Sequence, residues 1–246
     1  MIMVSPTGAR LTKTDHPAVP ITIPEIVAAT RECATAGAEA LHLHIRDREG
    51  RHSLDAGLYA EALAAIDEAL PGYPVQITTE SAGRYGPDDQ CNLLEKLVPK
   101  WASISLREVA QDHALARRIY AICQDNGTVV QHIVYTAEDA NTLRMWQAEG
   151  GLGADESVIL VLGSYAAGRA AQPTDLRALL RSLPPVNRWM VCAFGPSEHA
   201  CLRHAAQLGG DLRVGFENST TNSHGAPWPD VQSSVRALTE RMEQAA

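Results

Sequence analysis

Short runs of apolar, largely β-branched residues alternate along the chain with longer segments in which apolar residues recur at helical spacing. Strands are expected in the short runs, at 2–5, 39–46, 75–81, 101–106, 128–135, 157–163, 188–194 and 212–217. Helices are expected between them, at 23–37, 56–70, 87–98, 110–126, 138–150, 173–183, 197–208 and 229–245. The pattern therefore predicts eight consecutive βα units.

This succession of units indicates an α/β fold. Eight βα units in 246 residues, with no Pro/Gly/Ser-rich linker between them, predict a (β/α)8 TIM barrel that forms a single domain over 1–246. A doubly wound open sheet is the alternative. No GxGxxG or GxxxxGK[ST] motif follows any predicted strand, so neither a dinucleotide-binding fold nor a P-loop is supported.

Composition and charge narrow the class of protein. The chain is 45% hydrophobic and 20% charged, without an apolar run long enough to span a bilayer. A net charge of −8 argues against nucleic acid or an anionic membrane as the main partner, although a local arginine cluster can still bind a small anion. The five cysteines include no CxxC pair and indicate reduced thiols, and no secretory signal pattern opens the sequence. A cytoplasmic location is expected.

The segment 40–47, ALHLHIRD, carries two histidines in an apolar run. His42 and His44 share one side of a strand, and Arg46 follows on that side. On the last strand Arg213 and Glu217 share a side, and in a closed barrel both strands flank the first. Two histidines and a glutamate bind Zn²⁺ while leaving a position open. A metal site is therefore predicted, with ordinary core packing of the histidines as the alternative.

Polar side chains also mark the ends of two neighbouring strands. Thr78 and Glu80 share a side of the third strand, which places Glu80 at the rim of the barrel. A carboxylate there either pairs with a nearby arginine or acts as a general base. Ser103 and Ser105 share a face of the fourth strand, where their hydroxyls either bind a substrate carboxylate or fill a tapering barrel. The chain has no GxSxG elbow that would favour a serine nucleophile.

Four segments together resemble the β-keto acid cleavage enzyme family. HLHIRDREGRHSLDAGLYAEALAAI resembles the family segment H-L-H-[VI]-R-[DE]…G-R-x-S…Y…I, and GGDLRVGFEN resembles its closing G-G-H-[VI]-R-[VC]-G-[LF]-E-D. The opening SPTGARLTKTDHPAVPITIPEI resembles the family's T-G-A…P-x-[IL]-P-[IV]-T-P-E-E start, and VLGSYAAG resembles V-L-G-x-x-x-G. The resemblance extends over most of the chain.

The resemblance implies a (β/α)8 barrel that forms a homotetramer or homodimer, with zinc on the positions of His42, His44 and Glu217. It also implies a reaction in which a β-keto acid and acetyl-CoA give acetoacetate and a new acyl-CoA. In this reaction zinc chelates the keto acid through its carbonyl and carboxylate oxygens and stabilises an enolate. Substrate-contacting positions of the family match Arg213, Thr78 and Ser103.

Several acidic positions of the family are changed in this chain. The aspartate that usually follows the zinc glutamate is Asn218, which cannot take a proton. An acid after the TGA of the first strand is replaced by Arg10, and the acid on the fifth strand by Gln131. Glycines after the third strand are replaced by Glu80 and Ser81. Metal and carboxylate binding are therefore expected to be retained, whereas the base and CoA recognition are expected to differ.

The sequence leads to one main hypothesis and two alternatives. The main hypothesis is a zinc or other divalent-metal enzyme that acts on a small β-keto acid and acetyl-CoA. Its roles are metal binding by His42, His44 and Glu217, charge neutralisation by Arg46 or Arg213, carboxylate binding by Thr78, Ser103 and Ser105, and proton transfer by Glu80, with Asn218 at the usual acid position. The alternatives are a metal-dependent hydrolase of a small ester, lactone or amide, and a barrel that binds keto acid or acyl-CoA without catalysis.

Overall fold

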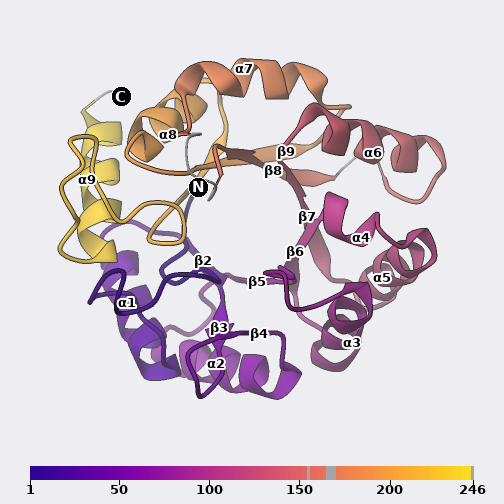
Figure 1. The fold of residues 1–246 in the computed structure, drawn as a ribbon, viewed down its shortest axis with the longest axis horizontal. Coiled ribbons are helices and arrows are strands. Elements are labelled where there is room, and N and C mark those ends of the chain that lie inside the picture. Colours follow the sequence, from indigo (N-terminus) through magenta and orange to yellow (C-terminus); the bar gives the residue numbers. More distant parts are fainter. Residues whose placement is uncertain (154–155, 165–169, 245–246) are drawn as a thin grey trace.

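Parallel strands form a closed ring at the centre of the computed structural model, which describes residues 1–153, 156–164 and 170–244 (Figure 1). Their order around the ring is β1-β10-β9-β8-β7-β6-β5-β2. The strands are β1 (Ile2–Val4), β2 (Ala40–Leu43), β5 (Val75–Thr78), β6 (Trp101–Ser105), β7 (Val129–Val134), β8 (Ser157–Leu162), β9 (Arg188–Ala193) and β10 (Asp211–Val214). The predicted (β/α)8 barrel is confirmed, and the open-sheet alternative is wrong.

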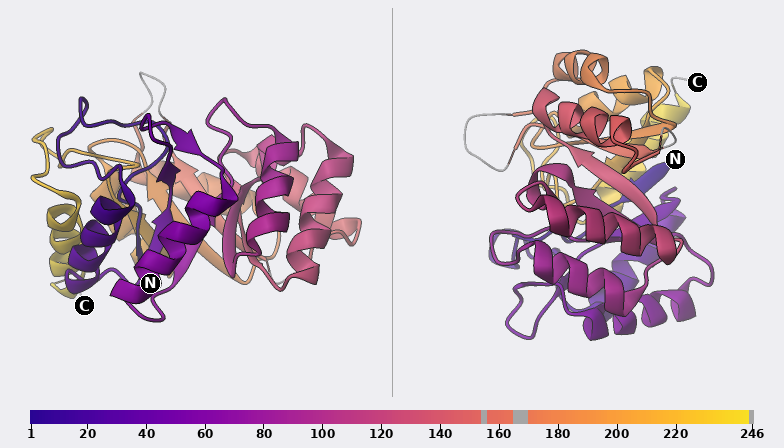
Figure 2. Two further views of the ribbon diagram at one scale, coloured as in Figure 1. Left: turned by 90° about the horizontal axis from the view of Figure 1, so that it is seen from below. Right: turned by 90° about the vertical axis from the view of Figure 1, so that its right-hand side faces the viewer.

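Helices surround the ring on all sides (Figures 1 and 2). They are α1 (Ile23–Thr35), α2 (Ala56–Ala69), α3 (Pro87–Leu97), α4 (Leu106–Val109), α5 (His113–Asp125), α6 (Ala137–Ala148), α7 (Pro173–Ser182), α8 (Glu198–Gln207) and α9 (Val231–Glu243). The helix predicted at 110–126 was placed wrongly at its start, because the Asp112 side chain caps α5 and separates it from α4. Residue 245 of the last predicted helix lies outside the described residues, as do residues 165–168 of the VLGSYAAG segment.

The strands separate two apolar layers. Alternate side chains pack outward against the helices, such as Ala102 and Ile104 on β6. The opposite face of each strand points into the barrel, where Met3, Ile159 and Met190 form a smaller cluster. This alternation directs Ser103 and Ser105 of β6 toward the barrel axis, as their shared side predicts.

The strand predicted at 39–46 is divided in the structure. β2 ends at Leu43, and β3 (Ile45–Arg46) pairs antiparallel with β4 (His52–Ser53) in a separate two-stranded sheet. The chain reverses between them in a turn, closed by the hydrogen bond from the Gly50 N–H to the Asp47 carbonyl at 2.9 Å. His44 therefore lies in the break between the barrel strand and the hairpin.

The strand predicted at 212–217 also ends early, at Val214. Gly215 has a φ of +144°, and a Cβ at this position would lie 2.3 Å from the Ser5 carbonyl oxygen, so only glycine fits. The N–H groups of Asn218 and Ser219 donate to the Gly215 carbonyl at 2.9 and 3.0 Å. Glu217 therefore reaches the barrel mouth from a turn and not by strand alternation.

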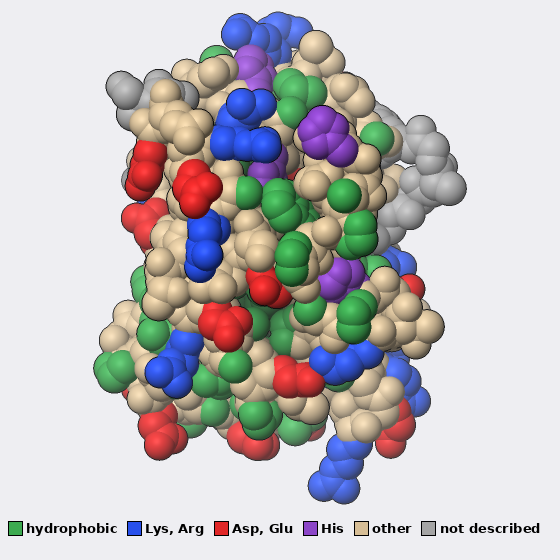
Figure 3. Space-filling model, turned by 90° about the vertical axis from the view of Figure 1, so that its left-hand side faces the viewer, with side chains coloured by type: hydrophobic (Ala, Val, Ile, Leu, Met, Phe, Trp, Pro, Cys, Tyr) green, Lys and Arg blue, Asp and Glu red, His purple; other side chains and the backbone are tan. Residues whose placement is uncertain are grey.

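Charged groups of both signs are distributed over the molecular surface. On the side of α1 and α9, acidic and basic side chains are interspersed and do not gather by sign (Figure 3). Among the residues described, none of the helices combines the length and the apolar character that crossing a membrane requires.

Candidate metal centre

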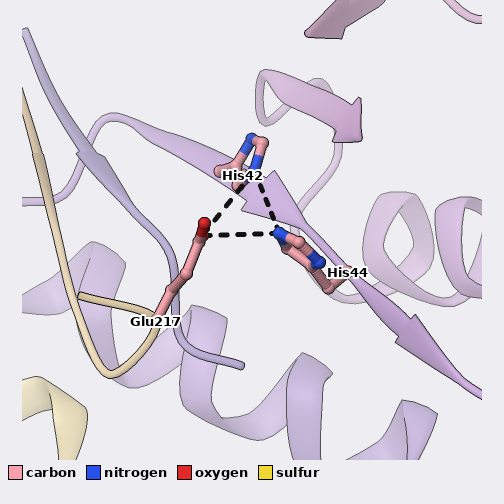
Figure 4. A group of neighbouring side chains, drawn as sticks. All are labelled: His42, His44 and Glu217. Carbon is pink, nitrogen blue, oxygen red and sulfur yellow. Dashed lines mark hydrogen bonds and ion pairs between the residues drawn. The ribbon is translucent and has the colours of Figure 1, made fainter. Parts of the chain in front are cut away.

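His42, His44 and Glu217 point toward one another at the mouth of the barrel (Figure 4). The two histidine Nε2 atoms are 3.2 Å apart, and Glu217 Oε2 lies 3.4 Å from His44 Nε2 and 3.7 Å from His42 Nε2. Tetrahedral zinc bonds of about 2.0–2.2 Å separate ligand atoms by about 3.3–3.5 Å. The three atoms therefore stand close to the spacing of one face of a zinc tetrahedron, and the residues fit a metal that keeps its fourth position open.

The protonation states of His42 and Glu217 favour metal binding. Burial, followed by the positive charge of Arg213, lowers the pKa of His42 well below its usual value. For Glu217, burial alone would raise the pKa, but Arg213 and the two imidazoles outweigh it and hold the pKa well below its usual value. Neutral imidazole and ionised carboxylate are the forms that bind metals.

A row of hydrogen bonds inside the barrel fixes the orientation of His42. Its Nδ1 lies 2.7 Å from the Oε1 atom of Gln76 on β5. The Gln76 amide donates to Gln131 Oε1 at 3.0 Å, and the Gln131 amide donates to the Ser157 hydroxyl at 3.4 Å. Because Gln76 Oε1 accepts only, His42 carries its proton on Nδ1 and directs the Nε2 lone pair to the metal position.

Glu217 is held by residues from the ends of β1 and β10. The Ser5 hydroxyl donates to its Oε2 atom, and Arg213 Nη2 donates to its Oε1 atom at 3.0 Å. Gly8 packs directly against it, because a Cβ at Gly8 would lie 2.8 Å from Glu217 Cγ, and its φ of +64° also favours glycine. The glycine of the TGA segment thus makes room for the Glu217 carboxylate.

A cavity of about 570 Å³ lies beside the three residues, at the C-terminal ends of the strands where barrel enzymes bind their substrates. Its polar lining includes His42, Glu217 and Arg213 together with Thr78, Glu80, Arg10, Arg107, Glu108 and Tyr135. The cavity therefore brings together a candidate metal centre, an arginine, a hydroxyl and a further carboxylate.

Glu80 lies in the wall of this cavity. Its backbone N–H donates to the Thr78 hydroxyl at 3.0 Å, which orients the loop that leaves β5. Burial raises the pKa of Glu80, and the carboxylates of Glu217 and Glu108 raise it further, while the neighbouring His44 imidazole and the charge of Arg10 lower it to a smaller extent. The nearest arginine is Arg10, whose Nη2 is 4.0 Å from Glu80 Oε1.

Other predicted site residues lie away from the cavity lining. The Arg46 guanidinium donates to the carbonyls of Gly8, Leu11 and Gly50 at 2.7–3.1 Å and so ties the loop after β1 to the hairpin. Ser103, Ser105 and Asn218 are buried, and in the described part of the chain their side-chain polar atoms have no hydrogen-bond partner. None of these four is among the described residues that line the cavity.

Several residues of the site were not singled out from the sequence. Gln76 shares a side of β5 with Thr78, and this parity could have revealed it as an inward side chain. Barrel enzymes place functional groups just after the C-terminal ends of the strands. Three further residues have such positions: Ser5 after β1, Arg107 after β6 and Tyr135 after β7. The sequence places these residues on or just after predicted strands but does not reveal their partners.

A Gln76→Leu variant is expected to bind zinc about 10–100-fold more weakly, because the loss of the acceptor frees the tautomer and the ring orientation of His42. Zinc affinity is measured by competition with a chromophoric chelator. A Gln207→Leu variant is the matched control, since Gln207 is exposed at the end of α8. Equal zinc affinity of the Gln76 variant and the unmodified protein would contradict the orienting role.

The fold and the site together define a class of protein, a (β/α)8 barrel with a candidate His₂Glu metal centre at its C-terminal mouth. Comparison with known families makes the assignment specific. The chain belongs to the beta-keto acid cleavage enzyme family, whose model matches residues 1–246. The resemblance inferred from the sequence motifs is thereby confirmed.

Individual relatives are similar at modest identity. The 3-oxoadipate:acetyl-CoA acetyltransferase of Cupriavidus necator is 28% identical over 238 residues, covering 89% of this chain and 80% of that protein. The 3-keto-5-aminohexanoate cleavage enzyme of Acetoanaerobium sticklandii is 28% identical over 229 residues, covering 89% and 83%. The apo structure of ObcA superposes with a TM-score of 0.70 at 15% identity; it covers 94% of this chain, which spans only 63% of ObcA, and supports the fold alone.

Proposed function

We propose that the protein is a zinc-dependent β-keto acid cleavage enzyme that converts a β-keto acid and acetyl-CoA into acetoacetate and a new acyl-CoA. The observation that carries this proposal is the buried His42, His44 and Glu217 set, with ligand atoms 3.2–3.7 Å apart, beside a cavity that Arg213 and Glu80 also line. Membership of the family and the activities for which the two curated relatives are named support the same reaction.

In the reaction the CH₂–carboxylate part of the keto acid exchanges its original acyl group for the acetyl group of acetyl-CoA. The bond that breaks joins the keto carbon to the CH₂ group lying between the keto and carboxylate groups. That CH₂ group then forms a bond with the carbonyl carbon of the acetyl group of acetyl-CoA. The thiolate released from acetyl-CoA takes the remaining acyl group. The products are therefore acetoacetate and one new acyl-CoA, in equal amounts.

Arg213 and Thr78, which line the cavity, bind the substrate carboxylate in this proposal. Zinc on the three ligands would supply Lewis acidity, which polarises the keto group and stabilises negative charge on its oxygen. Arg213, fixed by its hydrogen bond to Glu217, neutralises the carboxylate. The Thr78 hydroxyl oxygen accepts a hydrogen bond from the Glu80 N–H. The hydroxyl hydrogen is therefore available to donate to the substrate carboxylate.

Glu80 is the proposed base for the CH₂ group between the keto and carboxylate groups of the substrate. It lines the same cavity as His42 and Glu217, and its burial raises the pKa toward the range in which a carboxylate is an effective base. Asn218 has no basic atom and is not among the described residues that line the cavity. Glu80 thus takes the role that the family's aspartate would otherwise have.

A screen of β-keto acids with acetyl-CoA tests the proposal, with detection of both products by mass spectrometry. We expect acetoacetate and a new acyl-CoA in equal amounts for at least one keto acid. Turnover of esters, lactones or amides without any CoA thioester would instead support a metal-dependent hydrolase. Thermal stabilisation by keto acids without turnover across the whole panel would support a binding protein.

A further inference from the structure

A second charged feature of the cavity lies across the barrel mouth from the metal centre. In the closed ring β1 stands between β2 and β10, at whose C-terminal ends the candidate metal ligands lie, and β6 and β7 are strands on the opposite side. Arg107 follows β6 and Tyr135 follows β7, and both line the cavity. One cavity therefore connects the candidate metal centre to this pair.

The Arg107 guanidinium lies over the ring of Tyr135. The guanidinium carbon lies 3.5 Å from the centroid of the tyrosine ring. Stacking fixes the plane of the guanidinium and leaves the N–H donors at its edge available for a planar anion. Within residues 1–153, 156–164 and 170–244 these donors make no ion pair or hydrogen bond. The geometry suits bidentate binding of a carboxylate.

Acidic side chains near this wall are occupied by other partners. The Glu108 carboxylate accepts hydrogen bonds from the backbone N–H and the hydroxyl of Ser81, both at 3.0 Å. Asp175 accepts from the Gln172 N–H at 3.2 Å and caps the start of α7. Within the described residues neither carboxylate makes an ion pair with Arg107, so the guanidinium remains available to a negatively charged group of the substrate.

We propose that Arg107, seated on Tyr135, binds a carboxylate at the far end of the substrate, so that the enzyme selects β-keto acids with a second carboxylate. The inference rests on the proposed function, which places the keto group and first carboxylate at the metal side. A cavity of about 570 Å³ accommodates a keto diacid of this kind. A keto acid with a neutral or ammonium tail forms no ion pair with the Arg107 guanidinium and therefore binds less tightly.

The test compares two keto acids of equal length, 3-oxoadipate and 3-oxohexanoate, which differ in the remote carboxylate. We expect the unmodified protein to favour 3-oxoadipate at least about tenfold in kcat/KM. Arg107→Met lowers kcat/KM for 3-oxoadipate about 10–100-fold through KM, and leaves 3-oxohexanoate and the KM for acetyl-CoA within about twofold. The preference survives in Tyr135→Phe, which keeps the stacked ring, and weakens in Tyr135→Ala.

An Arg177→Met variant controls for the loss of one positive charge, because Arg177 is exposed on α7 and does not line the cavity. Equal losses for both keto acids in Arg107→Met would mean a structural role, and a raised KM for acetyl-CoA would mean a CoA subsite. Either result overturns the inference. So does a preference of the unmodified protein for the neutral tail.

Calorimetric binding of 3-oxoadipate without acetyl-CoA separates this inference from the reaction itself. We expect binding to the unmodified protein that is at least about tenfold weaker in Arg107→Met. Loss of binding in the variant without turnover of any keto acid would refute the reaction and leave the anion subsite standing. Equal binding to both proteins alongside normal turnover would refute the subsite and leave the reaction standing.

Discussion

A His42→Ala/His44→Ala variant is expected to purify without zinc and to lose keto acid cleavage by at least about 10³-fold. The double change removes two of the three ligand atoms, and a single buried carboxylate does not hold a zinc ion against water. Zinc content is measured by mass spectrometry on protein purified without added metal. Turnover is measured on the same preparations.

Two further variants make this result specific. His224→Ala removes an exposed histidine from the segment before α9 and is expected to keep both zinc and activity. Glu217→Gln retains the size of the third ligand and its contact with Ser5, and is expected to bind zinc at least about tenfold more weakly. Circular dichroism and thermal unfolding verify that each variant folds. Stoichiometric, tightly bound zinc in the double histidine variant would falsify the site assignment.

The grouping of His42, His44 and Glu217 is predictable from the sequence, but strand alternation accounts for the position of only one of the three. Alternation along a strand does direct His42 into the barrel, because β2 pairs in register with β1 and β5. His44 lies in the break before the hairpin, and Glu217 in the turn that Gly215 permits. In the closed barrel β1 lies between these two segments, so His44 and Glu217 come close together. Their positions depend on the strand break and on the turn at Gly215, and the periodicity of the sequence predicts neither.

Contacts between distant strands were beyond the reach of the sequence. Period two shows on which side of β5 Gln76 lies, but not that Gln131 stands beside it, since this depends on the register of the closed barrel. Arg46 follows the histidines as predicted, yet the loop after β1 turns its carbonyls toward the guanidinium and engages it. Charge and spacing alone do not distinguish this structural arginine from Arg213, which lines the cavity.

A Glu80→Gln variant is expected to lower kcat about 10²–10⁴-fold while zinc stays bound in stoichiometric amount. The amide keeps the size of the side chain and the loop contact of the Glu80 backbone with Thr78, but it cannot accept a proton from the substrate. Steady-state kinetics and metal analysis on the same preparation check both parts. Glu61→Gln, which removes an exposed carboxylate of α2, is the matched control.

The pH profile separates a base from a merely structural carboxylate. A carboxylate acts as a base only when it is ionised, and burial raises the pKa of Glu80. We therefore expect kcat/KM to be at its maximum above this raised pKa and to decrease as the pH falls through it. The Glu80→Gln variant is expected to lose this acidic limb along with the rate. Asn218→Asp restores the family's acid outside the described cavity lining, so it should not rescue Glu80→Gln. A rescued rate with a new acidic limb would assign proton transfer to residue 218 instead.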